Sequence, residues 1–173
     1  MIQFVLGDIT KLGGTPYQSA AIVNAANSQL LAGGGVCGSI FRAAGSALLQ
    51  RACDEMAPCP TGESRLTPAF DLQSQGVEAI IHAVGPDCRI TPQEEADALL
   101  ELAYTSAVRC ASEAGLSSIA FPSISTGIYG FPKERAAQID VDALRSVDRQ
   151  DLTITLVAFD PDTAELWGQV LSR

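Results

Sequence analysis

The chain has 173 residues, a length that fits one domain with a sizeable core and leaves little room for a second. Hydrophobic residues make up 47% of it and charged residues 18%, which is typical of a globular α/β protein. The formal net charge of −9 argues against a nucleic-acid binder, because binding to a phosphate backbone needs a basic surface. No apolar run is long enough to span a bilayer, and the N-terminal residues lack the features of a signal peptide. We therefore expect a cytoplasmic protein without a membrane partner.

Strand and helix patterns alternate along the chain. The predicted strands, in chain order, are Gln3–Leu6, Ala21–Asn24, Val77–Val84, Ser118–Phe121 and Leu152–Phe159. The predicted helices are Ser39–Met56, Gln93–Ala114, Lys133–Val147 and Thr163–Leu171. Strands that alternate with helices of this length indicate an α/β fold, with a mainly parallel sheet covered on both faces. We expect a single domain over residues 1–173.

The five cysteines and the single histidine, His82, form no recognisable metal or disulfide pattern. No CxxC pair is present, and zinc requires closely spaced ligands. We therefore expect no metal and no cofactor, and we interpret the thiols as reduced and mostly buried. His82 lies within an apolar run and is interpreted as a buried core residue that needs a hydrogen-bond partner.

Two glycine-rich stretches each precede a predicted helix. Gly33–Gly38 runs into the helix predicted from Ser39, and Ser125–Gly130 precedes the helix that begins near Pro132. Glycines at such junctions let backbone N–H groups approach an anion closely, and a helix N-terminus adds a favourable dipole. An acidic protein has to bind phosphates with such local dipoles, since it has no field of clustered Lys and Arg. Two opposed loops predict a site for a nucleotide-like diphosphate.

Neither of the common nucleotide-binding fingerprints is present. The dinucleotide motif G-x-G-x-x-G directly follows the first strand, whereas Gly33–Gly35 lies well beyond the second one. The chain also lacks the GxxxxGK[ST] motif of Walker-type NTPases. Ligands of open α/β sheets bind beyond the carboxyl ends of the strands. We expect one crevice there to collect Asp8, Asn27, both glycine-rich stretches and Phe159.

Five short motifs occur in order between about Gly7 and Phe159. They are Gly7-Asp8-Ile9-Thr10, Ile22-Val23-Asn24-Ala25-Ala26-Asn27, Gly33–Gly38 followed by Arg42-Ala43-Ala44-Gly45, Ile81–Pro86, and Phe121–Gly130. Each motif alone is a weak signal, but together they closely resemble a macrodomain of the MacroD type. The resemblance implies a three-layer α/β/α fold with a mixed central sheet and a pocket for ADP-ribose. The implied partner is ADP-ribose or an ADP-ribosylated protein, and nucleic acid only as an ADP-ribosylated adduct.

The resemblance also implies a role for each part of the crevice. Asp8 would accept a hydrogen bond from the adenine amino group, with Ile9 lining the base. Phe159 would stack on adenine, with Asp160 beside it, and Asn27 would bond the distal ribose, which carries the modified group. The backbone groups that would hold the diphosphate are those of Gly34, Gly35, Val36 and Gly38, and of Ser125, Thr126, Gly127, Ile128 and Tyr129.

Three of these residues also have a plain structural interpretation. Asp8 is a residue type that caps turns. Asn27 can occupy a turn itself, and Phe159 ends an apolar strand, where an aromatic ring can belong to the hydrophobic core. The sequence leaves these alternatives open.

The chain departs from the MacroD-type hydrolases at their catalytic positions. Where they usually carry an aspartate it has Cys37, and where they carry a histidine it has Phe41. The two replacements remove the usual general base. Three accounts stay open: water activated by the substrate's own phosphate while Asn27 and Gly35 orient the ribose, action of the Cys37 thiol at a helix N-terminus, or binding without catalysis. The resemblance favours the first, as hydrolysis of ADP-ribose esters on acidic residues or of O-acetyl-ADP-ribose.

Overall fold

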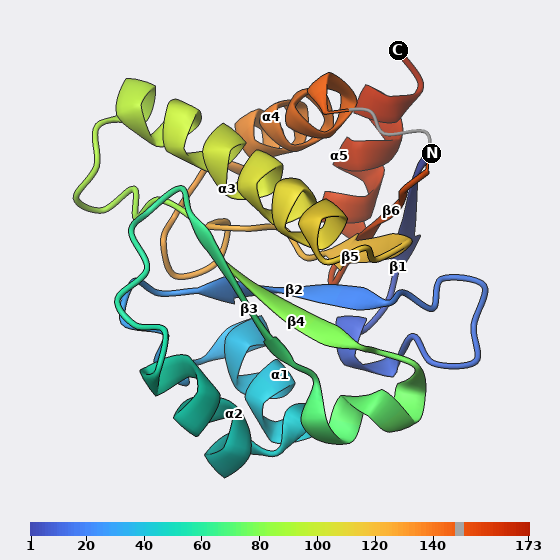
Figure 1. Ribbon diagram of the computed structural model, residues 1–173. Helices are drawn as coiled ribbons and strands as arrows, with labels where there is room; N and C mark the ends of the chain where they lie inside the picture. The colour runs from blue at the N-terminus through green and yellow to red at the C-terminus, as the bar shows by residue number, and fades with distance from the viewer. Residues whose placement is uncertain (148–150) are drawn as a thin grey trace.

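A mixed sheet of six strands lies at the centre of the fold, with helices on both of its faces (Figure 1). The computed structural model describes residues 1–147 and 151–173. The strands are β1 (Ile2–Leu6), β2 (Ala21–Ala26), β3 (Ser64–Pro68), β4 (Ala79–Val84), β5 (Ser118–Phe121) and β6 (Thr153–Ala158). They lie in the order β1-β6-β5-β2-β4-β3, and neighbours are parallel except for the antiparallel pair β3 and β4. The expected three-layer α/β/α arrangement with a mixed sheet is confirmed.

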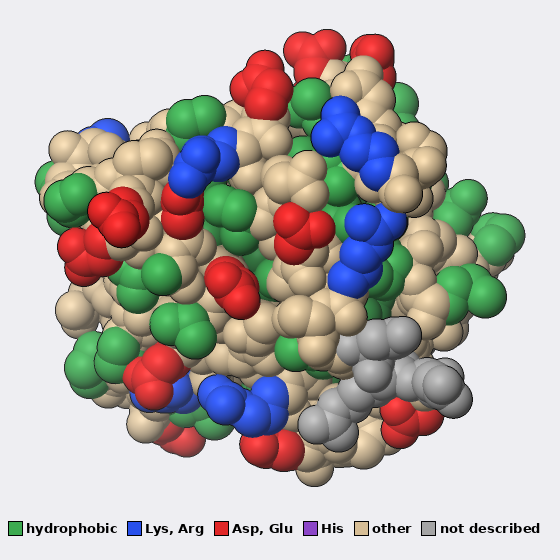
Figure 2. Space-filling model, turned by 90° about the horizontal axis from the view of Figure 1, so that it is seen from above, with side chains coloured by type: hydrophobic (Ala, Val, Ile, Leu, Met, Phe, Trp, Pro, Cys, Tyr) green, Lys and Arg blue, Asp and Glu red, His purple; other side chains and the backbone are tan. Residues whose placement is uncertain are grey.

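The helices form two groups, one on each face of the sheet. The first group contains α1 (Gly35–Ala44) and α2 (Ser46–Asp54) with the 3-10 helices η1 (Ile9–Lys11) and η2 (Phe70–Gln75); the second contains α3 (Gln93–Glu113), α4 (Lys133–Ser146) and α5 (Pro161–Leu171) (Figure 1). Figure 2 shows that the outer surface of the second group carries acidic and basic side chains among hydrophobic ones. Among the described residues, no helix is both long and apolar enough to cross a membrane.

Each face of the sheet has its own hydrophobic core. Successive side chains of a strand point to opposite faces. In β4, Ile80 and Val84 therefore pack on the side of α1 and α2, whereas Ile81 and Ala83 pack on the side of α3, α4 and α5. All four are buried. Burial on both faces explains why this strand is an almost uninterrupted apolar run in the sequence.

The single helix predicted over Ser39–Met56 is wrong in two respects. The first helix already begins at Gly35, and the chain is interrupted at Gly45 before α2 starts. Gly45 adopts a φ of +96°, and a Cβ at this position would lie 3.1 Å from a carboxylate oxygen of Asp71. The turn between the helices therefore requires a glycine. Helical periodicity alone does not reveal this break, because the apolar side chains on both sides of it face the same core.

Strand β3 has no counterpart among the predicted strands. It lies at the edge of the sheet, and only Thr67 of its five residues is buried. A half-exposed edge strand that ends in a proline lacks the apolar run and the clean alternation by which strands are found. Its antiparallel pairing with β4 is what makes the sheet mixed.

The parallel strands bring their carboxyl ends to one edge of the sheet. β1, β6, β5 and β2 all run in the same direction. The segments that follow them therefore meet at this edge, which is where open α/β sheets bind their ligands. These segments contain Gly7–Asp8, Asn27, Pro122–Tyr129 and Phe159.

Candidate functional site

A cavity of about 640 Å³ lies at these strand ends. Its volume falls in the range of roughly 300–1,000 Å³ that is usual for ligand pockets. The predicted site residues that line it are Asp8, Ile9, Asn27, Gly34, Gly35, Val36, Cys37, Ser125, Thr126, Gly127, Ile128, Tyr129, Phe159 and Asp160. The fold therefore brings together residues from four separate strand ends.

Gly38 differs from the other predicted site residues, because it does not line the cavity. Its N–H donates to the carbonyl oxygen of Gly34 at 3.3 Å, so it is already used within α1. A Cβ at this position would lie 2.5 Å from the carbonyl oxygen of Gly33. Gly38 thus allows the loop to pack closely against the helix, and contact of its N–H with a phosphate stays a prediction.

The N-terminus of α1 opens directly into the cavity. Gly34 is the N-cap, so Gly35, Val36 and Cys37 form the first turn, where N–H groups have no partner within the helix. Gly35 has a φ of +58°, and nothing lies within 4 Å of the place a Cβ would take. A helix N-terminus that borders a cavity is suited to binding an anion, because its N–H groups and its dipole both favour negative charge.

The next turn of α1 also lines the cavity, which the sequence analysis did not predict. Ser39 and Arg42 both line the cavity, and the Arg42 guanidinium donates to Ser39 Oγ at 3.2 Å. A helix that begins at Gly35 places positions 35, 39 and 42 on one face. The sequence contains this spacing, but a helix predicted to begin only at Ser39 does not include Gly35, so the shared face cannot be recognised. Ser123 and Thr163 also line the cavity and were not predicted.

The loop after β5 faces the cavity with a fixed backbone. Ser125 adopts a φ of +65°, which is uncommon for a residue with a side chain. Its carbonyl oxygen accepts a hydrogen bond from the N–H of Phe131 at 2.9 Å, and the N–H of Gly130 donates to Gly127 O at 3.0 Å. Ile128, at the tip of the loop, is 72% exposed.

The segment after β4 supports Tyr129 of this loop. The N–H of Cys88 donates to the Tyr129 carbonyl oxygen at 2.9 Å. The guanidinium carbon of Arg89 lies 5.7 Å from the centroid of the Tyr129 ring, within the range of a cation–π contact. Asp87 accepts two hydrogen bonds from the Arg89 guanidinium, at 2.9 and 2.7 Å, and a third from the Arg89 backbone N–H at 3.0 Å.

Asp8 both caps η1 and lines the cavity. Its Oδ1 accepts hydrogen bonds from Thr10 N at 2.9 Å and from Thr10 Oγ1 at 2.7 Å, while Oδ2 lies 3.7 Å from Lys11 Nζ. Partial burial acts to raise the pKa of the Asp8 carboxyl, but the hydrogen bonds from Thr10 and the charge of Lys11 outweigh it and lower the pKa. The capping interpretation is thus correct, and Oδ2 keeps the capacity to accept a further hydrogen bond.

Phe159 and Asp160 follow β6 and play different parts. Phe159 lines the cavity with 87% of its surface exposed, so the interpretation of its ring as plain core is excluded. Asp160 is the N-cap of α5, where it accepts hydrogen bonds from Thr163 N at 3.0 Å and Thr163 Oγ1 at 2.9 Å. It also pairs with Lys133 Nζ at 3.0 Å. Its carboxylate therefore fixes the beginning of α5 next to the cavity.

Asn27 orders the loop that leads from β2 to α1. Its Nδ2 donates to Leu31 O at 2.8 Å, and its Oδ1 accepts from Leu31 N at 3.1 Å. The turn interpretation is therefore correct, although the same side chain lines the cavity. A side-chain amide keeps one further donor and one further acceptor after two such bonds.

Cys37 is the first member of a buried polar network beneath the cavity. Its Sγ accepts a hydrogen bond from Asn24 Nδ2 at 3.6 Å and donates to Leu31 O at 3.8 Å. The same Asn24 nitrogen lies 3.1 Å from His82 Nδ1, and His82 Nε2 lies 3.0 Å from Thr67 Oγ1. The network joins α1 to β2, β4 and β3.

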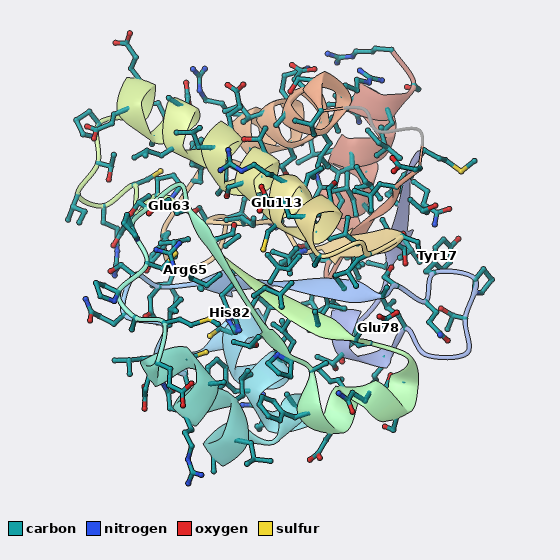
Figure 3. All side chains as sticks on the ribbon, viewed as in Figure 1. Tyr17, Glu63, Arg65, Glu78, His82 and Glu113 are labelled. Carbon is teal, nitrogen blue, oxygen red and sulfur yellow. The ribbon has the colours of Figure 1, made fainter. Side chains whose placement is uncertain are left out.

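His82 is fully buried and projects from β4 toward α1 and α2 (Figure 3). Burial lowers the pKa of its ring to about 4, so the imidazole is neutral near pH 7. Phe41 packs edge-on against it, with 6.4 Å between the ring centroids. The interpretation of His82 as a hydrogen-bonded core residue is confirmed. Because the Asn24 amide separates the ring from Cys37, the imidazole does not contact the thiol.

Known proteins resemble this chain over most of its length. A family model described as Macro domain matches residues 23–139. The chain belongs to the macrodomain family. Among curated proteins, this macrodomain is 42% identical over 179 residues to the O-acetyl-ADP-ribose deacetylase of Salmonella gallinarum, covering 99% of this chain and 94% of the relative. It is 41% identical to that of Escherichia coli, covering 99% of this chain and 96% of the relative.

Two solved structures are similar over nearly the whole macrodomain. The Oceanobacillus iheyensis macrodomain with ADP superposes with a TM-score of 0.88 at 37% identity, covering 99% of this chain and 90% of that one. The Trypanosoma brucei macrodomain in complex with ADP-ribose gives a TM-score of 0.82 at 32% identity, covering 98% of this chain and 68% of that one. At these identities the resemblance extends beyond the fold, and the membership expected from the five motifs is confirmed.

Proposed function

We propose that this macrodomain binds ADP-ribose in the cavity and hydrolyses ADP-ribose esters, either on acidic residues of proteins or in O-acetyl-ADP-ribose. The observation that carries the proposal is that two glycine-containing backbone segments line one cavity, and we assign both of them to the phosphates. One is the first turn of α1, and the other is the loop at Ser125–Tyr129. The names of the curated relatives and the ADP and ADP-ribose in the solved relatives support the same ligand.

The ligand fits the cavity in one direction. The exposed ring of Phe159 offers a stacking surface for adenine, and Asp8 offers an acceptor for its amino group. The diphosphate then lies across the N-terminus of α1. We place the distal ribose, which carries the modified group, at Asn27.

Hydrolysis replaces the bond between the ribose oxygen and the acyl group by the elements of water. Free ADP-ribose and a carboxylic acid are the products. We assign activation of the attacking water to the substrate's own phosphate, with Asn27 and Gly35 orienting the ribose. Support comes from Cys37, whose two polar contacts are with Asn24 and Leu31 and so involve no titratable group.

A second candidate function is ADP-ribose binding without turnover. It is favoured by Cys37 and Phe41, which stand where MacroD-type hydrolases have an aspartate and a histidine. The two functions predict the same affinity and differ only in the release of free ADP-ribose.

Calorimetry with ADP-ribose tests the common part of both functions. We expect a dissociation constant between sub-micromolar and tens of micromolar; a few micromolar corresponds to about −7 to −8 kcal/mol. Absence of both heat and thermal shift at millimolar ADP-ribose would refute binding. Turnover is measured as release of ADP-ribose from a mono-ADP-ribosylated acidic substrate and from O-acetyl-ADP-ribose, and no release from either favours the second function.

Two variants then test the mechanism. With water activated by substrate, Cys37→Ala keeps most of the wild-type rate, whereas Asn27→Ala loses far more of it. If the thiolate is the base or the nucleophile, Cys37→Ala is nearly inactive and the wild-type rate rises with pH as the thiol ionises. A folded Cys37→Ala protein that binds ADP-ribose but releases none would overturn the assignment.

A further inference from the structure

Tyr104, in the middle of α3, contacts the chain at the stem of the loop after β5. It is fully buried, and its hydroxyl makes two hydrogen bonds to backbone groups. It donates to the carbonyl oxygen of Pro122 at 3.1 Å and accepts from the N–H of Ile124 at 3.2 Å. One side chain thus bridges the two residues on either side of Ser123, where the chain leaves the sheet.

We propose that Tyr104 is the positioning residue for this phosphate-binding loop, and that it sets affinity for the diphosphate without touching the ligand. The inference rests on the proposed function. β5 ends at Phe121, so Pro122 O and Ile124 N have no place in the sheet ladder. Buried backbone groups of this kind need a partner, and the tyrosine hydroxyl is that partner.

We call the two hydrogen bonds that join the Tyr104 hydroxyl to Pro122 and Ile124 the clamp. It lies directly at the edge of the site. Pro122 and Ser123 line the cavity themselves, and Ser125 begins the stretch that faces the diphosphate. Ser125 adopts a φ of +65°, and its carbonyl oxygen accepts a hydrogen bond from the Phe131 N–H at 2.9 Å, so the loop backbone is already ordered next to the stem. A stem that is fixed before the ligand arrives lowers the ordering cost of binding, so its loss weakens affinity for phosphates in particular.

The surroundings of Tyr104 hold its hydroxyl in place. Its ring packs on Phe121 with 5.1 Å between the centroids. Burial, and after it the nearby carboxyl of Asp140 in α4, raises the pKa of the hydroxyl well above the usual value, so it stays protonated and able to donate to Pro122. Removal of the hydroxyl leaves the ring packed and two backbone groups without their partner, so Tyr104→Phe is a specific test.

The test compares ligands that share adenosine and differ in phosphate. Dissociation constants of wild type and Tyr104→Phe are measured for ADP-ribose and ADP by calorimetry, and for adenosine by NMR titration. We expect affinity for both diphosphates to fall about five-fold to thirty-fold, with affinity for adenosine changed less than about two-fold. An unchanged ratio of ADP affinity to adenosine affinity in folded Tyr104→Phe would overturn the proposal.

Two control variants separate positioning from general destabilisation. Ser106→Ala removes a hydrogen bond of another buried residue of α3, between Ser106 Oγ and Ser64 Oγ at 2.8 Å, and neither of these residues lines the cavity. Tyr17→Phe removes a hydroxyl from the loop between η1 and β2, on the right in Figure 3. Both are expected to keep the wild-type ratio of affinities. A change of that ratio in Ser106→Ala equal to that in Tyr104→Phe would also overturn the proposal.

Hydrogen exchange gives an independent measurement on the wild-type protein. The Ile124 amide is expected to exchange slowly although it lies outside helix and strand. Exchange as fast as that of an exposed loop amide would refute the clamp, even if Tyr104→Phe does not fold. Failure of wild type to bind ADP-ribose would refute the proposed function instead, and the Ile124 exchange rate would still report on the clamp.

Discussion

Recognition of adenine by Asp8 can be separated from its structural role with two substitutions. Oδ1 caps η1 through Thr10, whereas Oδ2 accepts the adenine amino group only in the proposed binding mode. Asp8→Ala removes both functions. Asp8→Asn keeps an oxygen for Thr10 and places an NH2 group where Oδ2 was, so the cap is retained and two donors face each other when adenine binds.

The structure sets the size of the two effects. Loss of an N-cap costs about 0.5–2 kcal/mol of stability, so Asp8→Ala is expected to lower the free energy of unfolding while Asp8→Asn leaves it nearly unchanged. Loss of a hydrogen bond to a charged group costs about 1.5–3 kcal/mol, or ten-fold to a hundred-fold in affinity, in both variants. The Asp8 side chain is 34% exposed, and water screens part of the interaction, so we expect the lower part of this range.

The assay measures binding of ADP and of IDP, in which a carbonyl oxygen replaces the amino group. Wild type is expected to prefer ADP. In Asp8→Asn the preference should shrink or reverse, because the new NH2 group donates to the carbonyl of the inosine base. Chemical denaturation of the same proteins measures the cap. Unchanged ADP binding by Asp8→Asn would mean that the base lies elsewhere, and an unchanged preference for ADP would refute the role of the carboxylate.

Two further predictions concern the first turn of α1 and the core beneath α4. Gly35→Glu is expected to abolish binding at millimolar ADP-ribose, because it places a carboxylate where phosphate must approach; Gly115→Glu, at a φ of +72° with open space around it, is the matched control and should bind normally. Normal binding by Gly35→Glu would exclude this turn as the phosphate site. Burial raises the pKa of Asp140 to about 8 from the unfolded value of 3.8, so the folded state keeps a proton that the unfolded state loses. The free energy of unfolding therefore falls as pH rises through this window, by up to about 1.4 kcal/mol per pH unit from this group. Between pH 5 and 8, the free energy of unfolding of Asp140→Asn, measured by chemical denaturation, should rise relative to that of wild type. A difference between the two proteins that does not change with pH would contradict a neutral Asp140.

Local patterns were sufficient to predict most of the fold. The strand around Ile80 and Ile81 was found because burial on both faces requires a continuous apolar run. The break at Gly45 and the edge strand at Ser64–Pro68 were missed for the opposite reason. A glycine inside an amphipathic stretch and a half-exposed strand leave little periodicity to detect.

Within the site, the sequence determined which residues meet, because glycine-rich junctions and polar strand ends are local signals and parallel strands bring them to one edge. Only the tertiary structure decided what each of them contacts. In it, Asp8 caps η1 and Asn27 orders a turn, and both also line the cavity. The Phe159 ring is exposed and does not belong to the core. The tertiary structure also placed Asn24 between Cys37 and His82, from three elements far apart in the chain. Such hydrogen bonds depend on the register and packing of segments that are distant in the sequence. The local spacing of residues therefore does not predict them.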